Sequence, residues 1–225
     1  MIYFSPDFIK FFKELSKNNH TEWFKENKSR YEKVVKEPFL VFVGDLLKDL
    51  QKKIPGLETD PKKVVMRINR DIRFSADKSP YKLHMGAMIT PGKAKSMNHP
   101  GFYIELSADR CAVYGGAYQP GKESLYAIRS AIASQPKKFN ALIQNTDFKK
   151  YFGALQGEKN KVIPAEFKEY LSTQPLIANK QFYFMTETKA SSILDEDYRP
   201  MVLKIISAGI PLNRFFEEAM QGIYS

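Results

Sequence analysis

Residues 102–118 read FYIELSADRCAVYGGAY, and this stretch decides the class of fold. Residues 102–107 and 112–118 alternate apolar and polar side chains, which is the period of a half-buried β-strand. Residues 108–110 lie between them and are few enough for a tight turn, so we expect an antiparallel hairpin. Gly115 and Gly116 inside the second strand indicate a bulge or a close backbone approach rather than a phosphate-binding loop.

Helical patterns flank this hairpin on both sides. Upstream and downstream of it, apolar residues recur at the spacing of one buried helical face. We expect a single α+β domain over residues 1–225, with an antiparallel sheet covered by N-terminal and C-terminal helices. A smaller helical lobe that begins near residue 120 is the alternative. The expected helices are 6–17, 21–37, 38–50, 122–132, 136–143, 198–208 and 212–220, and the further strands are 64–70, 83–90 and 180–186.

The composition is that of a globular protein, with 43% hydrophobic and 27% charged residues in a chain of 225. No apolar run approaches the roughly 20 residues that cross a bilayer, and residues 1–17 lack the pattern of a signal peptide. Cys111 is the only cysteine, which excludes an intrachain disulfide and fits a reducing compartment. We therefore expect a cytoplasmic protein without a membrane partner, in which Cys111 is a small core residue rather than a reactive thiol.

The positive charge is concentrated in one part of the chain. The formal net charge is +10, and residues 61–100 hold nine Lys and Arg against two acids, a net of +7. A diffuse excess would mainly affect solubility, whereas a concentrated one favours an anionic partner. The sequence thus predicts an anionic small molecule or a nucleic acid as the partner.

Residues 67–82, RINRDIRFSADKSPYK, carry five of these nine cations and both acids. Asp71 and Asp77 are the obvious partners for its arginines, because an unpaired buried charge is too costly to keep. A guanidinium held by an acid also presents a planar fork of donors suited to carboxylate or phosphate. The stretch is therefore either an anion site or an Arg–Asp network that only stabilises a hairpin. The candidate ligand-binding residues are Arg67, Arg70, Arg73, Lys78 and Lys82.

The same stretch carries a pattern that resembles a family of uncharacterised proteins of bacteria and fungi, known only as a domain of unknown function. The resemblance rests above all on residues 70–75 and 77–82, and it continues at residues 18–19, 23–24, 31, 38, 103, 115–118 and 129. Near Pro164 the chain reads Pro-Ala-Glu-Phe where the family usually has a Pro-Lys-Gly-Tyr turn, so that turn carries no expectation here. The resemblance implies relatives but no activity.

Three functions remain open at this point. The favoured one is a binding domain for a phosphate-bearing or other anionic ligand. The second is an enzyme on such a ligand, with Asp71 or Asp77 as the general base and Tyr81 or His84 assisting proton transfer. The third is a scaffold whose Arg–Asp network is purely structural.

Other kinds of site find little support. The three histidines share no ligand spacing and lack neighbouring acid pairs, so we expect no metal site. We expect no cofactor either, because phosphate-loop and dinucleotide fingerprints are missing. A nuclease-like core would need acids on adjacent strands with a lysine nearby. Glu105 could face Asp71 across a sheet, but no Glu-x-Lys follows it, so this reading has little support. Asn18, Asn19 and Trp23 are interpreted as turn and core residues, and the alternative places them beside the arginines as a second wall of the site.

Overall fold

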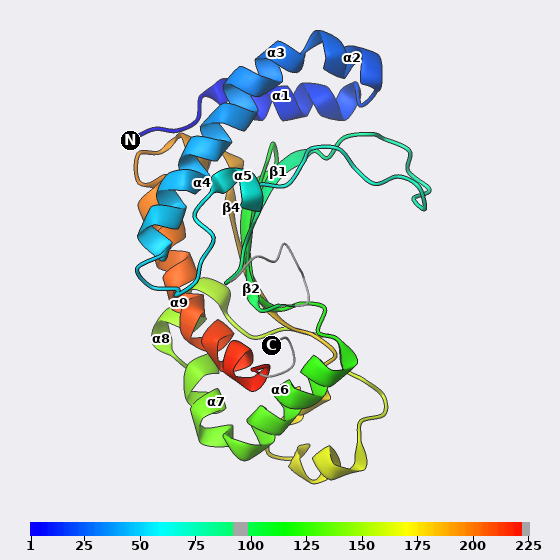
Figure 1. The fold of residues 1–225 in the computed structure, drawn as a ribbon, viewed down its shortest axis with the longest axis vertical. Coiled ribbons are helices and arrows are strands. Elements are labelled where there is room, and N and C mark those ends of the chain that lie inside the picture. Colours follow the sequence, from blue (N-terminus) through cyan, green and yellow to red (C-terminus); the bar gives the residue numbers. More distant parts are fainter. Residues whose placement is uncertain (92–98, 222–225) are drawn as a thin grey trace. The chain divides into compact units, whose positions relative to one another are not determined.

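The computed structural model describes residues 1–91 and 99–221 and has the α+β architecture that the sequence predicts (Figure 1). Four antiparallel strands pair in the order β1-β2-β3-β4. The hairpin expected within residues 102–118 is confirmed as β2 and β3. The strands are β1 (His84–Ile89), β2 (Gly101–Ser107), β3 (Arg110–Ala117) and β4 (Phe182–Lys189).

The chain divides into two compact units, and strands β2, β3 and β4 and the last helix each contribute to both. Unit 1 comprises Met1–Lys93, Tyr103–Val113 and Glu187–Lys204, and unit 2 comprises Ala94–Phe102, Tyr114–Thr186 and Ile205–Ser225. None of the helices in the described part of the chain combines the length and the apolar character that a membrane span needs.

Unit 1 contains the N-terminal helices, and the first of them buries the face that its apolar spacing predicts. Phe8, Phe11, Phe12 and Leu15 of the first helix are all buried. The single helix expected over 21–37 is wrong, since the structure breaks it at Asn27 and makes a π-helical turn over Glu32–Lys36. This turn runs without a break into α4 (Glu37–Leu50), whose second residue, Pro38, has no N–H for the regular helical bond. The elements are α1 (Pro6–Lys17), α2 (Thr21–Glu26), α3 (Lys28–Tyr31), η1 (Glu32–Lys36), α4 (Glu37–Leu50), α5 (Pro61–Val64) and η4 (Ala190–Leu194).

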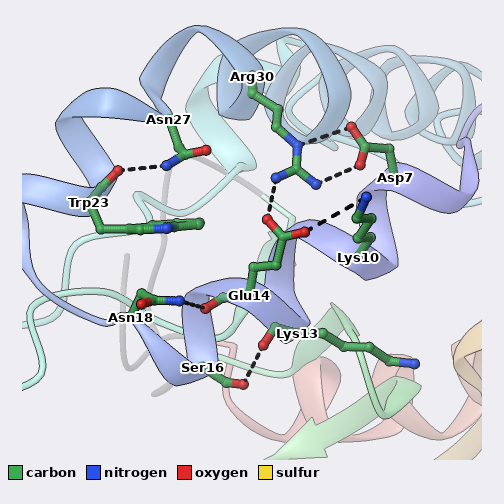
Figure 2. A network of polar contacts seen from close by, with 9 residues as sticks. All are labelled: Asp7, Lys10, Lys13, Glu14, Ser16, Asn18, Trp23, Asn27 and Arg30. Carbon is green, nitrogen blue, oxygen red and sulfur yellow. Dashed lines mark hydrogen bonds and ion pairs between the residues drawn. The ribbon is translucent and has the colours of Figure 1, made fainter.

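A salt-bridge cluster that the sequence did not reveal joins α1 to α3 (Figure 2). The Arg30 guanidinium donates two hydrogen bonds to the Asp7 carboxylate and a third to Glu14. Its carbon lies 5.6 Å from the centroid of the Phe11 ring, so the charge also packs over an aromatic face. These bonds lower the pKa of the Asp7 carboxyl. Arg30 therefore links helices α1 and α3 of unit 1.

Cys111 is buried in unit 1, as a small core residue should be. Burial is the main cause that raises the pKa of its thiol to about 11. The thiol therefore stays protonated at neutral pH, which is the opposite of what a reactive cysteine needs.

The strand expected over residues 64–70 is wrong. Residue Val64 ends the short helix α5, whose first turn is capped by the Asp60 side chain accepting from the Lys62 N–H at 2.9 Å. Pro61 stands at the start of that turn, where its fixed φ and missing N–H favour a helix. Beyond it the chain makes only isolated bridges, at Val65 and Asn69. Residues 64–70 therefore do not form a regular strand.

The remaining helices lie in unit 2, apart from the last one, which both units share. The two closing helices expected at 198–208 and 212–220 form this one continuous helix, with Pro211 inside it. Gly209 does not end the helix. A Cβ there would lie 2.6 Å from the Phe184 ring and 2.9 Å from Phe102, so the glycine allows close packing. Gly115 faces the same two rings, a close approach of the kind the sequence indicated. The elements are α6 (Lys122–Ser134), α7 (Pro136–Ile143), α8 (Thr146–Phe152), η2 (Ala165–Tyr170), η3 (Pro175–Ala178) and α9 (Tyr198–Ala219).

Candidate functional site

Residues 66–83 form an arm that extends away from β1 and doubles back on itself (Figure 1, the turquoise loop). The Arg70 N–H donates to the Pro80 carbonyl at 2.9 Å, and the Lys82 N–H donates to the Ile68 carbonyl at 2.8 Å. Asn69 and Tyr81 form an isolated antiparallel bridge between these bonds. The two sides of the stretch singled out in the sequence are therefore paired, although not as regular strands.

The pairing of the arm changes register where the arm joins the sheet. Asn69 pairs with Tyr81, whereas Val65, four residues earlier, pairs with Ala87, six residues later. Two extra residues therefore lie on the returning side. A bulge of this kind bends a strand and redirects its side chains, and it falls on the segment that carries Lys82.

The loop between α1 and α2 anchors the arm at Tyr81. The Asn19 side chain donates to the Tyr81 carbonyl at 2.9 Å and accepts from the Tyr81 N–H at 3.1 Å. The Tyr81 ring stacks on Phe24, with centroids 3.9 Å apart and planes 18° from parallel. Tyr81 is only 7% exposed. This environment favours an anchoring role for Tyr81 over the proton-transfer role considered for it.

The three residues Asn18, Asn19 and Trp23 separate into two groups. Asn19 lies beside the arm, as the alternative interpretation required. Asn18 instead donates to the Glu14 carbonyl at 2.9 Å, which closes the end of α1 (Figure 2). The Trp23 ring lies 5.6 Å from that of Phe11 and belongs to the aromatic cluster of unit 1. Asn19 is thus the one of the three that contacts the arm.

The outer part of the arm, residues 70–79, is a loop closed by its own side chains, and we refer to it as the tip loop. Arg70 pairs with Asp77 and donates to the Ser79 carbonyl at 3.0 Å and to the Ser75 hydroxyl at 3.4 Å. Asp77 also accepts from the Ser79 N–H at 2.9 Å. The hydrogen bonds from Ser79, and then that from Arg70, lower the pKa of Asp77 to about 2.

The other two cations of the tip loop also have partners. Arg73 donates two hydrogen bonds to the Asp71 carboxylate, from Nε at 3.0 Å and from Nη2 at 2.7 Å. This bidentate pair lowers the pKa of the Asp71 carboxyl. Lys78 donates to the Ile72 carbonyl at 3.0 Å. Three of the five predicted ligand-binding cations are therefore used within the loop itself.

These contacts bear on the general bases considered for an enzyme. A general base works best with a pKa near the operating pH. Asp71 and Asp77 are both held as carboxylates by cations and N–H groups, with pKa values below the ordinary one. Neither acid therefore has the proton affinity that the role requires at neutral pH.

Where the arm meets the sheet, two cations remain. Arg67 is exposed and Lys82 is half-buried. Neither side chain has a hydrogen bond or ion pair with an acid in residues 1–91 or 99–221. Burial, and then the neighbouring Arg67 charge, lower the pKa of Lys82. Together with His84, on which the Lys82 charge also acts, these residues are called the base cluster below.

His84 starts β1 and faces two side chains of β2. Its Nε2 lies 3.2 Å from the Tyr103 hydroxyl and 3.9 Å from a Glu105 carboxylate oxygen. The side chains of His84 and Glu105 are 27% and 16% exposed. Burial lowers the pKa of His84, Glu105 opposes that shift, and Lys82 and Arg110 add to it. The imidazole is therefore neutral at pH 7, with an acid close to it.

Glu105, which the sequence could place opposite Asp71, instead has His84 and Arg110 as its neighbours. The Nη2 atom of Arg110 lies 3.8 Å from it. His84 accordingly has an acid beside it that is distant in sequence. The alternation of β2 places Tyr103 and Glu105 on one face, which was the available signal. What the sequence lacked was the pairing of β1 with β2.

Gly86 makes room for this arrangement. A Cβ at Gly86 would lie 2.0 Å from the Tyr103 hydroxyl oxygen, so the ring packs directly over the glycine. Clusters of three or more His, Cys, Asp or Glu that could hold a metal ion do not occur in the described residues. The groups gathered here are the cations Arg67 and Lys82, the His84 imidazole, the Tyr103 phenol and the Glu105 carboxylate.

Comparison with known proteins gives a family but no activity. The profile of the family described as "Conserved hypothetical protein (DUF2461)" matches residues 7–215, a range that includes the arm and the base cluster. None of the curated proteins matches the chain. The ligand and the chemistry therefore have to follow from the geometry of the residues themselves.

Proposed function

We propose that this chain, which belongs to the family of conserved hypothetical proteins (DUF2461), binds a phosphate-bearing or other anionic ligand through Arg67 and Lys82. The observation that carries the proposal is a half-buried lysine next to an arginine, without an acid partner in the described residues. Like charges repel, and burial makes the repulsion stronger than it would be in water. A bound anion would offset both the repulsion between the two cations and the cost of burying the Lys82 charge.

The tip loop supports this proposal by contrast. Arg70, Arg73 and Lys78 belong to the same basic stretch, but each has a local acceptor. Their role in the proposal is to hold the arm in shape, with Arg70 closing the loop across Asp77. The anion therefore binds at the base cluster, and the tip loop keeps the two sides of the arm together.

His84 completes the base cluster as a neutral donor or acceptor. It is half-buried beside Lys82, so an anion bound to that lysine would come close to the imidazole. An anion favours the protonated form of a nearby histidine. Binding should therefore be stronger at mildly acidic pH, where His84 can gain a proton and a positive charge.

An enzyme on an anionic substrate is the second candidate, and His84 is the observation that favours it. A neutral imidazole with Tyr103 at 3.2 Å has the protonation state of a general base at pH 7. Asp71 and Asp77 are poor candidates for that role because both are held as stable carboxylates. If the protein is an enzyme, Arg67 and Lys82 hold the substrate. The proton is then accepted by His84 and not by an aspartate.

Titration of the ¹⁵N-labelled protein with inorganic phosphate, followed by NMR, tests the binding. The backbone amides of residues 67 and 82–84 should shift and saturate. Lys82→Met and Arg67→Gln should each weaken binding about tenfold or more, since a charge-assisted hydrogen bond contributes about 1.5–3 kcal/mol.

Lys62→Met is the matched control, because Lys62 is an exposed lysine outside the arm. It should leave the affinity for phosphate unchanged. If Lys82→Met and Arg67→Gln bind phosphate as tightly as the wild type, the base cluster is not the anion site. If neither the wild type nor any variant binds phosphate, the result supports the third function, a structural scaffold.

A further inference from the structure

The tip loop presents an aromatic ring that the anion site does not explain. Phe74 is 96% exposed, and no other aromatic side chain in residues 1–91 and 99–221 reaches half exposure. A phenylalanine usually buries most of its surface, since the ring is large and entirely apolar. A single ring left in water at the end of an arm therefore requires a reason.

The hydrogen bonds of the tip loop fix where this ring stands. The Ser75 N–H donates to the Ile72 carbonyl at 3.3 Å, and Lys78 donates to the same carbonyl at 3.0 Å. The Arg70–Asp77 pair closes the loop behind them. The exposed ring thus belongs to a loop with bonds on both sides of it, and not to a free chain end.

Arg73 gives the ring a cationic neighbour. Its guanidinium carbon lies 5.9 Å from the Phe74 centroid, and its side chain is 76% exposed. Its partner Asp71 is 48% exposed, so both members of the pair face solvent. The tip loop therefore offers a stacking face and an accessible guanidinium side by side.

The ligand that matches a flat apolar ring within a basic segment is single-stranded nucleic acid. Residues 67–82 carry five cations against two acids, which complements a phosphate backbone. An unpaired base stacks on an aromatic ring whatever its identity, while a duplex keeps its base faces covered. A membrane would need more apolar surface than one ring, because Arg73, Ser75 and Ala76 surround Phe74.

We infer that the arm binds single-stranded nucleic acid, with Phe74 stacking on a base and the base cluster holding a phosphate of the same strand. This inference rests on the proposed anion site, which supplies the second contact. Seven residues separate Phe74 from Arg67, which is at most about 23 Å, and a strand of about 12 nucleotides exceeds that length even at the duplex rise of about 3.4 Å per nucleotide. One strand of about 12 nucleotides can therefore reach both ends of the arm.

Fluorescence anisotropy with a labelled 12-residue oligothymidylate tests the inference. An oligomer of the same length with abasic sites throughout has the phosphates but no bases, and it serves as the comparison ligand. Phe74→Ala should weaken oligothymidylate binding by between about fivefold and about 150-fold, since stacking contributes about 1–3 kcal/mol per base. It should leave binding of the abasic oligomer unchanged, and Phe74→Trp should preserve binding of both.

The outcomes separate this inference from the anion site. If Phe74→Ala binds oligothymidylate as the wild type does, the stacking role is refuted while phosphate binding can still hold. If the wild type binds neither oligomer nor inorganic phosphate, both proposals fail. Sedimentation of the wild type and of Phe74→Ala adds one more criterion. A dimer that becomes a monomer on substitution would assign Phe74 to a protein contact and overturn the inference.

Discussion

The tip loop and the base cluster lie on one arm and carry the same kind of charge, yet their surroundings are opposite. In the tip loop, Arg70 and Arg73 each meet an aspartate within the loop. In the base cluster, the half-buried Lys82 lies beside Arg67, and burial and that positive charge both lower its pKa. A count of cations along the sequence treats the two regions as one basic patch. Their local partners distinguish the tip loop, whose cations are paired, from the base cluster, which is the proposed anion site.

The difference also separates stability from binding. Cations that meet acids stabilise the fold to a modest degree and have little left for a ligand. Cations that meet other cations cost stability, and such a cost persists where it serves a function. The two regions are distinguished by substitutions at their common anchor, by substitutions within each region, and by the protonation of His84.

The largest effect is expected at the anchor of the whole arm. Tyr81→Ala removes a buried ring that stacks on Phe24, and it should lower the free energy of unfolding by about 3–5 kcal/mol. Tyr81→Phe keeps the ring and should stay within about 1 kcal/mol of the wild type. Urea unfolding followed by the fluorescence of Trp23, which lies in the same unit, measures both. A large loss in Tyr81→Phe would show that the hydroxyl, not the stack, anchors the arm.

A smaller effect with opposite signs is expected on the two regions themselves. Arg70→Ala opens the tip loop and should lower stability by about 1 kcal/mol, a value reduced because Asp77 is largely exposed. Lys82→Met removes a partly buried charge beside Arg67 and should raise stability by about 0.5 kcal/mol without an anion. The same unfolding experiment measures both. If Lys82→Met also destabilises, the base cluster has a partner and the contrast between the two regions disappears.

The sequence predicted the parts of the fold that depend on local periodicity. The hairpin of β2 and β3 followed from a period of two over residues 102–118, and the buried face of α1 from helical spacing. Errors arose where one residue type serves two purposes. Gly209 lies between the two helices predicted at 198–208 and 212–220, yet it lets the Phe102 and Phe184 rings pack against the continuous α9. Which purpose a glycine serves depends on its tertiary neighbours, and these are distant in the chain.

The candidate site, like the fold, was predictable only where it depends on residues close in sequence. Asp71 and Asp77 were named as partners for the arginines because they are the only acids nearby, and the pairs Arg73–Asp71 and Arg70–Asp77 agree with that expectation. The neighbours of His84 could not be found, because they depend on the register of β1 against β2. The two-residue shift between the pairs Asn69–Tyr81 and Val65–Ala87 was equally invisible. Local charge balance can thus be read from a sequence, whereas contacts across a sheet require its register.

The smallest effect concerns the protonation of His84, and it reports directly on the base cluster. The folded pKa of His84 lies below the ordinary 6.5, so on acidification the unfolded state takes up the proton first. Stability from this group is therefore complete above pH 6.5 and declines as the pH falls towards the folded pKa. Sulfate, whose charge is constant over this range, should raise the pKa of His84 when it binds at Lys82. A pH titration of the imidazole by NMR, in sulfate and in chloride of equal ionic strength, measures the shift. A specific anion at the base cluster raises the pKa in sulfate alone, whereas equal curves in the two salts would mean only general screening and would leave Lys82 without its ligand.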